Sequence, residues 1–433
     1  MHIAYICADP GIPVFGQKGC SIHVQEVIRA FQQQGATVEL FAVRWGDQTP
    51  ADLAGVKVHR LPPIPKGEAG LREQVALTIN PDLQVELELS GPFDLIYERY
   101  SLWSYSAMEF AQTAGIPGIL EVNAPLIEEQ AEHRGLVHRE QAERVAECVF
   151  RAAQGIVAVS KEVKGYLSRW GMADKVQVIP NGVNHQRFTT DLEPAIPKGS
   201  DAFTIGFIGS LKPWHGLSHL VNAFAKLHQR VPQARLLIVG DGPQRDTLQT
   251  DLEQRGLLPF AHLTGAVSPE QIPAFLASMD VGVAPYPTHL DFYFSPLKVV
   301  EYMAAGLPVV VSDIGQLSHL VTHRHTGWLC PSGDEGALAA ALEELWQSPE
   351  LRQQLGQAGQ QHILAHHTWE KVAQQILAMA FGQGSPEHQN QIPEPEQAPL
   401  GRGRGGCAQS LQPTPPSGHP STKGMVYQEN VKR

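Results

Sequence analysis

The sequence lacks the patterns that mark membrane-spanning and secreted proteins. It contains no run of about 18 apolar residues, the shortest length that spans a bilayer as a helix. The opening MHIAYICADP has no basic start followed by a long apolar run, as a secretory leader would have. We therefore expect a cytoplasmic protein without a transmembrane segment, in at most peripheral contact with a membrane.

Positive charge and closely paired cysteines are also scarce. The 433 residues include 33 Lys and Arg against 44 Asp and Glu, which gives a formal charge of -11. This balance repels nucleic acid unless a compact basic patch exists, and no such patch stands out, so no nucleic-acid partner is expected. The five cysteines form no CxxC pair, which excludes the common zinc and redox motifs.

The two commonest nucleotide-binding loops are missing from the start of the chain. No GxGxxG follows the first strand-like run, and no glycine-rich loop ends in Gly-Lys-Ser/Thr. A nicotinamide-dependent oxidoreductase needs the first of these loops, so the sequence does not favour that class of enzyme.

What the sequence does contain is the alternation typical of parallel sheets. Short runs rich in Val, Ile and Leu alternate with longer segments of helical period, and the length suffices for two domains. The expected strands are 3–7, 38–43, 95–97, 118–122 and 156–159, then 204–208, 235–239, 262–263, 281–284 and 309–311. One long helix is expected over 128–153. The predicted fold is α/β, with two doubly wound, Rossmann-like domains facing a cleft.

Interruptions of this pattern predict the domain boundaries. The N-terminal domain should cover 1–185, a linker 186–200 and the C-terminal domain 201–367, followed by a last helix over 368–381. From 382 to 433 the composition shifts to Gly, Pro, Gln and Ser, which predicts a disordered tail.

The loop after the first expected strand carries glycines suited to an anionic ligand. Gly16 and Gly19 precede the first helix, where backbone N–H groups can approach an anion closely. His23 follows in the first helical turn and is expected to face the cleft. An ordinary turn and a structural histidine are the alternatives.

The segment TIGFIGSLKPWHGL places Ser210, Lys212 and His215 between a strand and a helix. A cation at this position would neutralise the charge of a departing diphosphate, and Lys212 is the candidate. The alternative is a solvent-facing lysine in a turn.

The segment FYFSPLKVVEYMAAGLPVVVSD places Ser295, Pro296 and Lys298 at the start of a helix. A helix start offers free N–H groups to phosphate, and Glu301 could accept both hydroxyls of a ribose. Because Glu301 follows Lys298 by three residues, an ion pair on the helix surface is the alternative.

Together these segments resemble the family 4 glycosyltransferases of the GT-B fold, from residue 1 to about Ala380. The stretches VIPNGVNHQRF, LLIVGDGPQRDTL and HLTGAVSPEQIPAFLASMDVGVAP extend the resemblance in order and spacing. It implies retaining transfer of a hexose from a UDP- or GDP-sugar to a hydroxyl of a glycan, lipid or small molecule. The last helix would cross back to the N-terminal domain. No cofactor and no metal are implied, and the chain has no Asp-x-Asp pair to hold Mg²⁺.

The resemblance also assigns site residues. Glu301 would contact the ribose, the backbone of Gly265, Ala266 and Val267 the base, and Lys212 with helix-start amides the leaving diphosphate. The expected donor-binding residues are Gly16, Gly19, Ser210, Lys212, His215, Gly265, Ala266, Val267, Tyr293, Ser295, Pro296, Leu297, Lys298 and Glu301. The expected acceptor-side residues are His23, Glu98, Arg99, Glu121 and Asn123.

Four of these positions depart from the family pattern. Tyr293 stands where the first of two paired glutamates is expected, so a contact to the donor sugar is missing or rebuilt. Ser210 and His215 replace an arginine and a lysine, whose charge Lys212 and Lys298 are hypothesised to supply. Asn123 replaces a histidine and is counted, with Lys212 and Glu301, among the expected catalytic residues. An epimerase acting on nucleotide sugars and an inactive binding protein remain alternatives.

Overall fold

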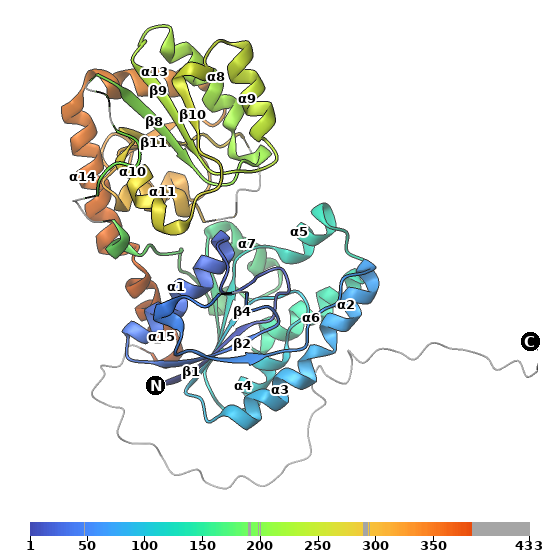
Figure 1. The fold of residues 1–433 in the computed structure, drawn as a ribbon. Helices are drawn as coiled ribbons and strands as arrows, with labels where there is room; N and C mark the ends of the chain where they lie inside the picture. Colours follow the sequence, from blue (N-terminus) through green and yellow to red (C-terminus); the bar gives the residue numbers. More distant parts are fainter. Residues whose placement is uncertain are drawn as a thin grey trace, which may run out of the picture. The chain divides into compact units, whose positions relative to one another are not determined.

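The computed structural model describes residues 1–46, 48–188, 192–197, 199, 201–288, 293 and 295–382. It contains two parallel sheets, each in its own α/β domain (Figure 1), which confirms the expected fold class. The strand orders are β3-β2-β1-β4-β5-β6-β7 and β10-β9-β8-β11-β12-β13. The expected disordered tail lies, apart from Gly382, outside the described residues.

The first sheet belongs to the N-terminal domain. Its strands are β1 (His2–Cys7), β2 (Thr37–Ala42), β3 (Lys57–Arg60), β4 (Leu95–Arg99), β5 (Gly118–Val122), β6 (Gly155–Ala158) and β7 (Val176–Val178). Its helices are α1 (Gly19–Gln33), α2 (Ala69–Leu77), α3 (Ile79–Ser90), α4 (Ser106–Ala114), α5 (Leu126–His133), α6 (Arg139–Ala152) and α7 (Lys161–Arg169).

The second sheet belongs to the C-terminal domain. Its strands are β8 (Phe203–Ile208), β9 (Ala234–Val239), β10 (Ala261–Leu263), β11 (Val281–Ala284), β12 (Val309–Ser312) and β13 (Trp328–Cys330). Its helices are α8 (Leu217–His228), α9 (Arg245–Gln254), α10 (Ile272–Ala277), α11 (Leu297–Ala304), α12 (Leu317–Leu320), α13 (Glu335–Gln347) and α14 (Pro349–His366).

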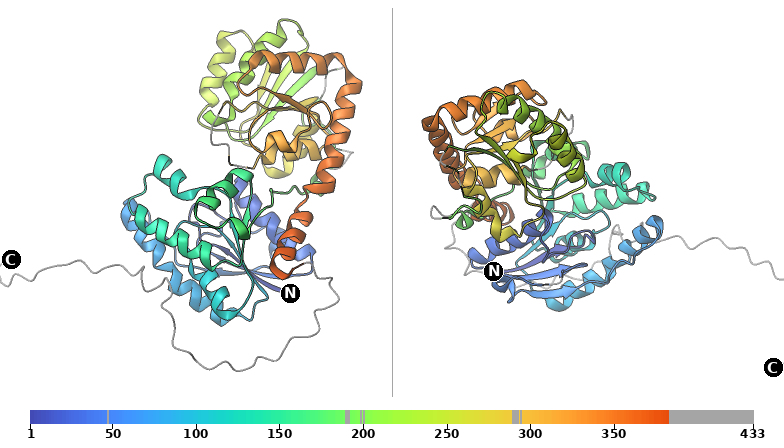
Figure 2. Two further views of the ribbon diagram at one scale, coloured as in Figure 1. Left: turned by 180° about the vertical axis from the view of Figure 1, so that it is seen from behind. Right: turned by 45° about the horizontal axis from the view of Figure 1, so that its top comes forward.

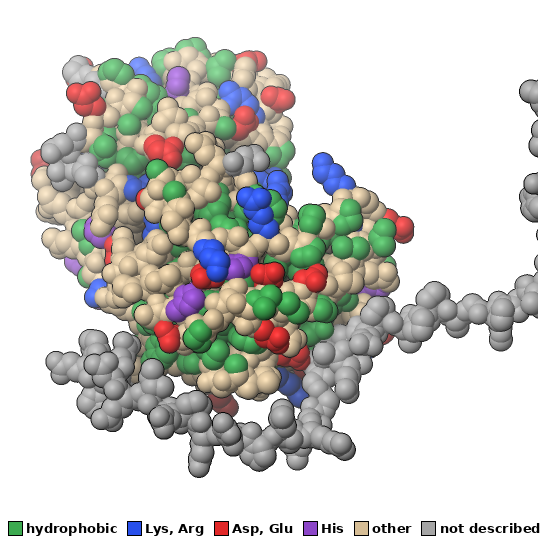
Figure 3. Space-filling view, turned by 60° about the horizontal axis from the view of Figure 1, so that its bottom comes forward, with side chains coloured by type: hydrophobic (Ala, Val, Ile, Leu, Met, Phe, Trp, Pro, Cys, Tyr) green, Lys and Arg blue, Asp and Glu red, His purple; other side chains and the backbone are tan. Residues whose placement is uncertain are grey.

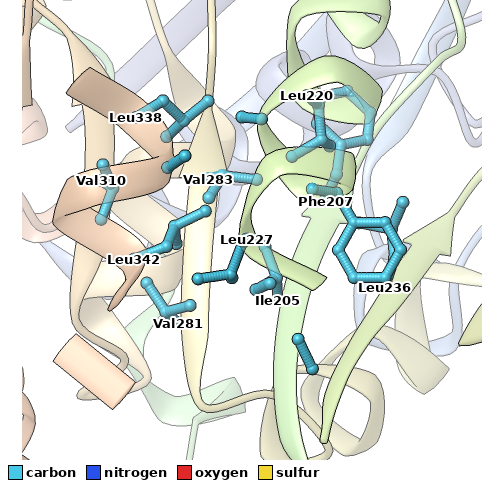
Figure 4. Close-up of a cluster of buried hydrophobic side chains, with 14 of the residues drawn as sticks. Ile205, Phe207, Leu220, Leu227, Leu236, Val281, Val283, Val310, Leu338 and Leu342 are labelled. Atoms are coloured by element: carbon cyan, nitrogen blue, oxygen red, sulfur yellow. The ribbon is translucent and has the colours of Figure 1, made fainter. Parts of the chain in front are cut away.

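Helices cover both faces of each sheet, as the two views of Figure 2 show. Strands covered in this way must be apolar on both sides, which explains why β1, β5 and β6 are nearly continuous runs of buried residues. In the C-terminal domain, α8 and α13 pack over one face, where Phe207, Leu220 and Leu342 belong to one cluster of buried apolar side chains (Figure 4). The other face is covered by α10 and α11, and α14 packs on α11.

The last helix, α15 (Trp369–Phe381), packs on the N-terminal domain rather than on the domain that precedes it. It contacts α1, and its Trp369, Ala373 and Ile376 share a core cluster with Ile3 and other residues of the first sheet. Thr368 caps its start by accepting a hydrogen bond from the N–H of Lys371.

The expected helix over 128–153 is wrong, because the structure divides it into α5 and α6. Between them Gly135 adopts a φ of 77°, a left-handed conformation that ends a helix. Strands β3, β7 and β13 were not anticipated either. They are three or four residues long, and β3 has exposed ends and two half-buried residues between them, so they give little periodic signal.

Among the described residues, no helix combines the length and the apolar character needed to cross a membrane. The face drawn in Figure 3 mixes basic, acidic, histidine and apolar side chains, and no broad basic surface is visible on it. This face therefore offers no continuous positive surface to a polyanion.

Candidate functional site

Glycine turns bring three strand ends of the C-terminal domain together. The N–H of Gly209, after β8, donates to the carbonyl of Val239 at 2.9 Å, and the N–H of Gly240, after β9, donates to the carbonyl of Gly265 at 3.0 Å. Gly209 adopts a φ of 141°, which side chains with a Cβ rarely allow. The carboxyl ends of β8, β9 and β10 therefore form one edge, the place where open parallel sheets bind ligands.

Lys298 lies in the first turn of α11 and points to this edge. Its ammonium is 4.1 Å from the ring centroid of Phe207 and 5.5 Å from that of Tyr286. A Cβ at Gly209 would lie 3.0 Å from Lys298 Nζ, so the glycine leaves the space that the ammonium occupies. Burial lowers the pKa of Lys298 to about 7, although Glu301 acts in the opposite direction.

His215 belongs to the same edge but carries no charge at neutral pH. Its Nδ1 donates to the carbonyl of Ser210 at 2.6 Å. Burial and the neighbouring Lys298 and Lys212 lower the pKa of His215 to about 4. Ser210 and His215 therefore brace the loop and supply no positive charge.

Lys212 lies in this loop, immediately before a 3-10 turn (Pro213–His215). Its Nζ is 5.7 Å from the ring centroid of Trp214, a side chain that is 43% exposed. Lys212 is half-buried and close enough to lower the pKa of His215. Both lysines proposed from the sequence thus lie around His215.

Glu301 follows one turn after Lys298 on α11 and meets an arginine from a distant segment. Arg187 Nη1 lies 3.5 Å from Glu301 Oε1. Burial raises the pKa of Glu301, while Arg187 opposes this rise and Glu26 on α1 adds to it. The Arg187 guanidinium also donates to the carbonyl of Pro269, close to the loop that contains Gly265.

The residues before α11 approach both domains. Pro296 is the N-cap residue, and the N–H of Leu297 donates to the carbonyl of Ser295 at 3.0 Å. The hydroxyl of Ser295 is buried and has no hydrogen-bond partner among the described residues. Tyr293 Oη donates to Glu129 Oε2 on α5 at 3.4 Å.

The loop after β10 is shaped by its glycine and an arginine. Gly265 adopts a φ of 76°, and a Cβ there would lie 3.3 Å from Arg245 Nη1. This Nη1 atom is buried and has no hydrogen-bond partner among the described residues. Ala266 and Val267 follow, with Val267 packed against the apolar cluster on the α11 face of the sheet. The loop is therefore anchored on one side and flanked by positive charge on the other.

A buried charged cluster marks the carboxyl end of β5 in the N-terminal domain. His23 Nε2 lies 2.7 Å from Glu121 Oε1, and Arg99 Nη1 lies 3.8 Å from Glu121 Oε2. Burial alone would raise the pKa of Glu121, but His23, Arg99 and Asn123 hold it below its ordinary value. Four expected acceptor-side residues, His23, Arg99, Glu121 and Asn123, thus lie together around the carboxylate of Glu121.

Glu98 does not join this cluster. Neighbouring residues of a strand point to opposite faces, so Glu98 faces away from Tyr97 and Arg99. Its carboxyl accepts a hydrogen bond from the hydroxyl of Ser104. Burial raises the pKa of Glu98 to about 7, with Ser104 opposing the rise.

A cavity of about 190 Å³ opens at the carboxyl ends of β1 and β4. It is lined by apolar residues such as Trp103 and by charged side chains of both signs, including Arg72, Glu129 and Arg134. Glu129 is also the partner of Tyr293, so the cavity lies beside the segment that precedes α11.

The loop between β1 and α1 is held in place by its own helix. Gln25 Nε2 donates to the carbonyls of Val14 at 2.7 Å and Gly16 at 2.9 Å. A Cβ at Gly16 would lie 2.9 Å from the carbonyl oxygen of Pro13, whereas Gly19 has open space around it. The first glycine is therefore needed for the turn itself.

Arg187, Glu26 and Arg245 are site candidates that the sequence reasoning missed. Arg187 is the last but one residue of the segment VIPNGVNHQRF, and Glu26 ends the run SIHVQE; both stretches belong to the family resemblance. A charged side chain within a segment that carries the family resemblance was the sequence signal that could have identified them. Among the described residues, no group of three or more His, Cys, Asp or Glu side chains could hold a metal ion.

Comparison with known proteins identifies the family of both domains. A model of "Glycosyltransferase Family 4" matches residues 18–187, and a model of "Glycosyl transferases group 1" matches residues 189–362. The D-inositol 3-phosphate glycosyltransferase of Stackebrandtia nassauensis is 27% identical over 392 residues, which cover 84% of this chain and 86% of that protein.

A second relative is the GDP-mannose-dependent alpha-(1-6)-phosphatidylinositol monomannoside mannosyltransferase of Mycobacterium tuberculosis. It is 28% identical over 227 residues, which cover 50% of this chain and 58% of the relative.

Solved structures share the fold at lower identity. Sucrose-phosphate synthase from Thermosynechococcus elongatus superposes with a TM-score of 0.66 at 21% identity, covering 88% of this chain and 98% of that one. Anabaena HepE in complex with UDP and glucose superposes with a TM-score of 0.65 at 20% identity, covering 87% and 98%. The chain is a glycosyltransferase and belongs to the group 1, family 4 glycosyltransferases of the GT-B fold.

Proposed function

We propose that this enzyme transfers a hexose from a UDP- or GDP-sugar to a hydroxyl acceptor, with retention of configuration and without a metal. The donor nucleotide binds mainly to the C-terminal domain and the acceptor mainly to the N-terminal domain. The observation that carries the proposal is the grouping of Glu301, Lys298 and the Gly209 turn at one edge of the second sheet. The Glu301 carboxylate, which can accept both hydroxyls of a diol, lies here one helical turn from the Lys298 ammonium, which can bind a phosphate.

The relatives support a nucleotide sugar but differ in its base. One curated relative is named as GDP-mannose-dependent, whereas Anabaena HepE was solved with UDP and with UDP-glucose. The backbone of Gly265, Ala266 and Val267 is the proposed contact for the base, and Arg187 and Arg245 flank this loop.

The acceptor is proposed to enter the N-terminal domain at the cavity beside Glu129. Charged side chains of both signs and Trp103 line this cavity, a combination that suits a polyhydroxyl compound. Asn123 and the ionised Glu121 lie at the end of β5 and are proposed to orient the reacting hydroxyl. Tyr293 takes the place of a donor-sugar contact and instead reaches Glu129.

In the proposed reaction the enzyme positions the substrates and neutralises charge. The acceptor hydroxyl attacks the anomeric carbon from the face that the diphosphate leaves, and a phosphate oxygen takes its proton. Lys212 and Lys298 stabilise the departing diphosphate electrostatically.

A donor screen tests this proposal directly. UDP-, GDP- and ADP-sugars are compared by thermal shift, where a ligand at about 100 times its Kd adds roughly 2.7 kcal/mol of stability. The best donor is then incubated with candidate acceptors, and nucleoside diphosphate release is measured with and without EDTA.

The products distinguish the competing functions. A transferase releases nucleoside diphosphate and forms a glycoside whose anomeric configuration equals that of the donor. A changed sugar formed without acceptor indicates an epimerase, and binding without any turnover indicates an inactive protein. Loss of activity in EDTA would contradict metal independence.

A further inference from the structure

The N-terminal domain has a second cavity, of about 630 Å³, that takes no part in the reaction proposed above. It lies at the carboxyl ends of β2 and β3, beside the loop between β1 and α1, and is called the Trp45 cavity here. Among the described residues its lining contains no acidic side chain, but it includes Phe15, Gln17, Arg44, Trp45 and Gln48. Aromatic rings beside amides and a guanidinium suit a sugar, which presents both C–H groups and hydroxyls.

Backbone hydrogen bonds hold the walls of the Trp45 cavity together. The N–H of Val14 donates to the carbonyl of Arg44 at 3.0 Å, and the N–H of Phe15 donates to the carbonyl of Trp45 at 2.7 Å. Gly46 adopts a φ of 96°, and a Cβ there would lie 3.0 Å from the backbone of Phe15, so the glycine permits this close pairing. The two loops are therefore joined into one wall, and a ligand needs to spend little binding energy on ordering them.

The side chain of Trp45 is fixed in position but stays accessible. The Arg60 guanidinium lies 4.5 Å from the centroid of its ring, and the indole packs against the core cluster of the N-terminal domain. Trp45 is nevertheless only half-buried and lines the cavity. Beside it Arg44 is exposed and forms no ion pair within the part of the chain that the structure describes, so its N–H donors are available to a ligand.

The Trp45 cavity adjoins the cavity beside Glu129 in two places. Ile64 lines the Glu129 cavity, and the residue before it, Pro63, lines the Trp45 cavity. Gly11 and Pro13, two residues apart in the loop after β1, divide between the two cavities in the same way. Consecutive Cα atoms are about 4 Å apart, so the two linings meet within about 7 Å at both places. One extended ligand is therefore able to occupy both cavities.

We propose that the Trp45 cavity is a second subsite for the acceptor and that the acceptor is an oligosaccharide, free or attached to a carrier. This inference rests on the proposed function and narrows its substrate class. The reacting sugar lies in the Glu129 cavity, and the next unit packs against Trp45 while Arg44 and the two glutamines bind its hydroxyls. A lipid chain suits the Trp45 cavity less well, because it would cover polar side chains without offering them hydrogen bonds.

A glycan array probed with the intact protein tests this subsite without any donor. The array carries neutral and acidic glycans, from monosaccharides to hexasaccharides, and the protein should bind oligosaccharides in preference to their single units. The best oligosaccharide is then titrated by calorimetry. Trp45→Ala should weaken its binding by about tenfold, as truncation of an aromatic anchor commonly does. Trp45→Phe should retain most of the affinity, because it keeps an aromatic face, and Arg44→Ala should weaken binding less than Trp45→Ala.

Trp214→Ala is the matched control. This tryptophan is 43% exposed, belongs to the C-terminal domain and lines neither cavity, so glycan affinity should be unchanged. Should Trp45→Ala fold poorly, Arg44→Ala still provides a test, because the Arg44 side chain is exposed.

A kinetic measurement follows once a donor is known. Trp45→Ala should raise the KM of an oligosaccharide acceptor by about tenfold and leave its kcat unchanged, because the second subsite binds the acceptor away from the reacting atoms. The kcat/KM of a monosaccharide acceptor should be the same in Trp45→Ala as in the wild type. A merely structural role of Trp45 would instead lower both values together.

The outcomes separate the second subsite from the proposed function. A wild type that binds no oligosaccharide, or that binds one as tightly as both Trp45→Ala and Arg44→Ala do, refutes the subsite. Transfer that is as efficient to a single sugar as to its oligosaccharides refutes the subsite and supports the proposed function. Oligosaccharide binding that depends on Trp45, in a protein that transfers no sugar, refutes the proposed function and leaves the cavity as a glycan-binding site.

Discussion

Arg187 Nη1 lies 3.5 Å from Glu301 Oε1, which joins the end of the N-terminal half of the chain to the helix that carries the proposed donor site. Burial raises the pKa of the Glu301 carboxyl, and the Arg187 guanidinium limits this rise. The ionised form is the one that accepts both hydroxyls of a ribose. Arg187 is therefore assigned as a positioning residue for Glu301.

Substitution of Glu301 should weaken donor binding. Glu301→Ala removes charged hydrogen bonds to the ribose and should cost about 1–3 kcal/mol in nucleotide affinity, measured by calorimetry. Arg187→Ala should leave a carboxyl with a higher pKa. Relative to the wild type at the same pH, its affinity should thus be reduced more at pH 6 than at pH 8, a difference that Glu301→Gln lacks. Unchanged affinity in Glu301→Ala would remove this residue from the site.

Replacing Lys298 should stabilise the folded protein at low pH. The pKa of Lys298 falls from 10.5 to about 7 on burial, so the unfolded chain binds more protons between these values. The destabilisation caused by burying the Lys298 ammonium is therefore fully present below pH 7 and disappears as the pH rises towards 10.5. Urea unfolding should show Lys298→Met more stable than the wild type at pH 6, by a margin that shrinks at pH 9. Lys226→Met, which removes a lysine that pairs with Glu335 on the same domain, should show no such trend. A less stable Lys298→Met at pH 6 would contradict the prediction.

The protein should lose stability in mild acid because two histidines are buried neutral. Burial lowers the pKa of His215 and His367 to about 4 from the ordinary 6.5. The unfolded chain binds more protons between these values, so stability falls as the pH drops from 6.5 to 4. His215→Gln should reduce the slope of stability against pH by up to about 1.4 kcal/mol per pH unit. Thermal unfolding across this range measures it, and an unchanged slope would argue against a buried neutral His215.

Removal of the Glu121 carboxylate should destabilise the N-terminal domain. Glu121→Gln leaves Arg99 buried without its counter-charge, which typically costs about 3–5 kcal/mol. Glu143→Gln is the control, because that carboxylate pairs with Arg139 at 2.9 Å on the surface and should contribute at most about 1 kcal/mol. Denaturant unfolding of both variants measures the difference. Equal stability of the two variants would mean that the Glu121 network is not an ion pair.

Much of the fold could be predicted from local pattern. The two series of apolar runs predicted two parallel sheets because strands covered on both faces must be apolar on both sides. The short strands β3, β7 and β13 were not predicted, because three or four residues are too few to show a reliable period. The break between α5 and α6 was not predicted, because it depends on the φ of Gly135, which composition alone does not reveal.

The candidate site likewise has a part that the sequence predicted and a part that only the structure shows. The sequence by itself determined the fold class, the family and the segments that carry Lys212, Lys298 and Glu301, because these depend on residue type, order and spacing. Only the tertiary structure decided that Lys298 is buried against Phe207 and that Arg187 faces Glu301. The burial of a charge and the pairing of residues far apart in the chain are set by how the elements pack, and no local pattern encodes that packing.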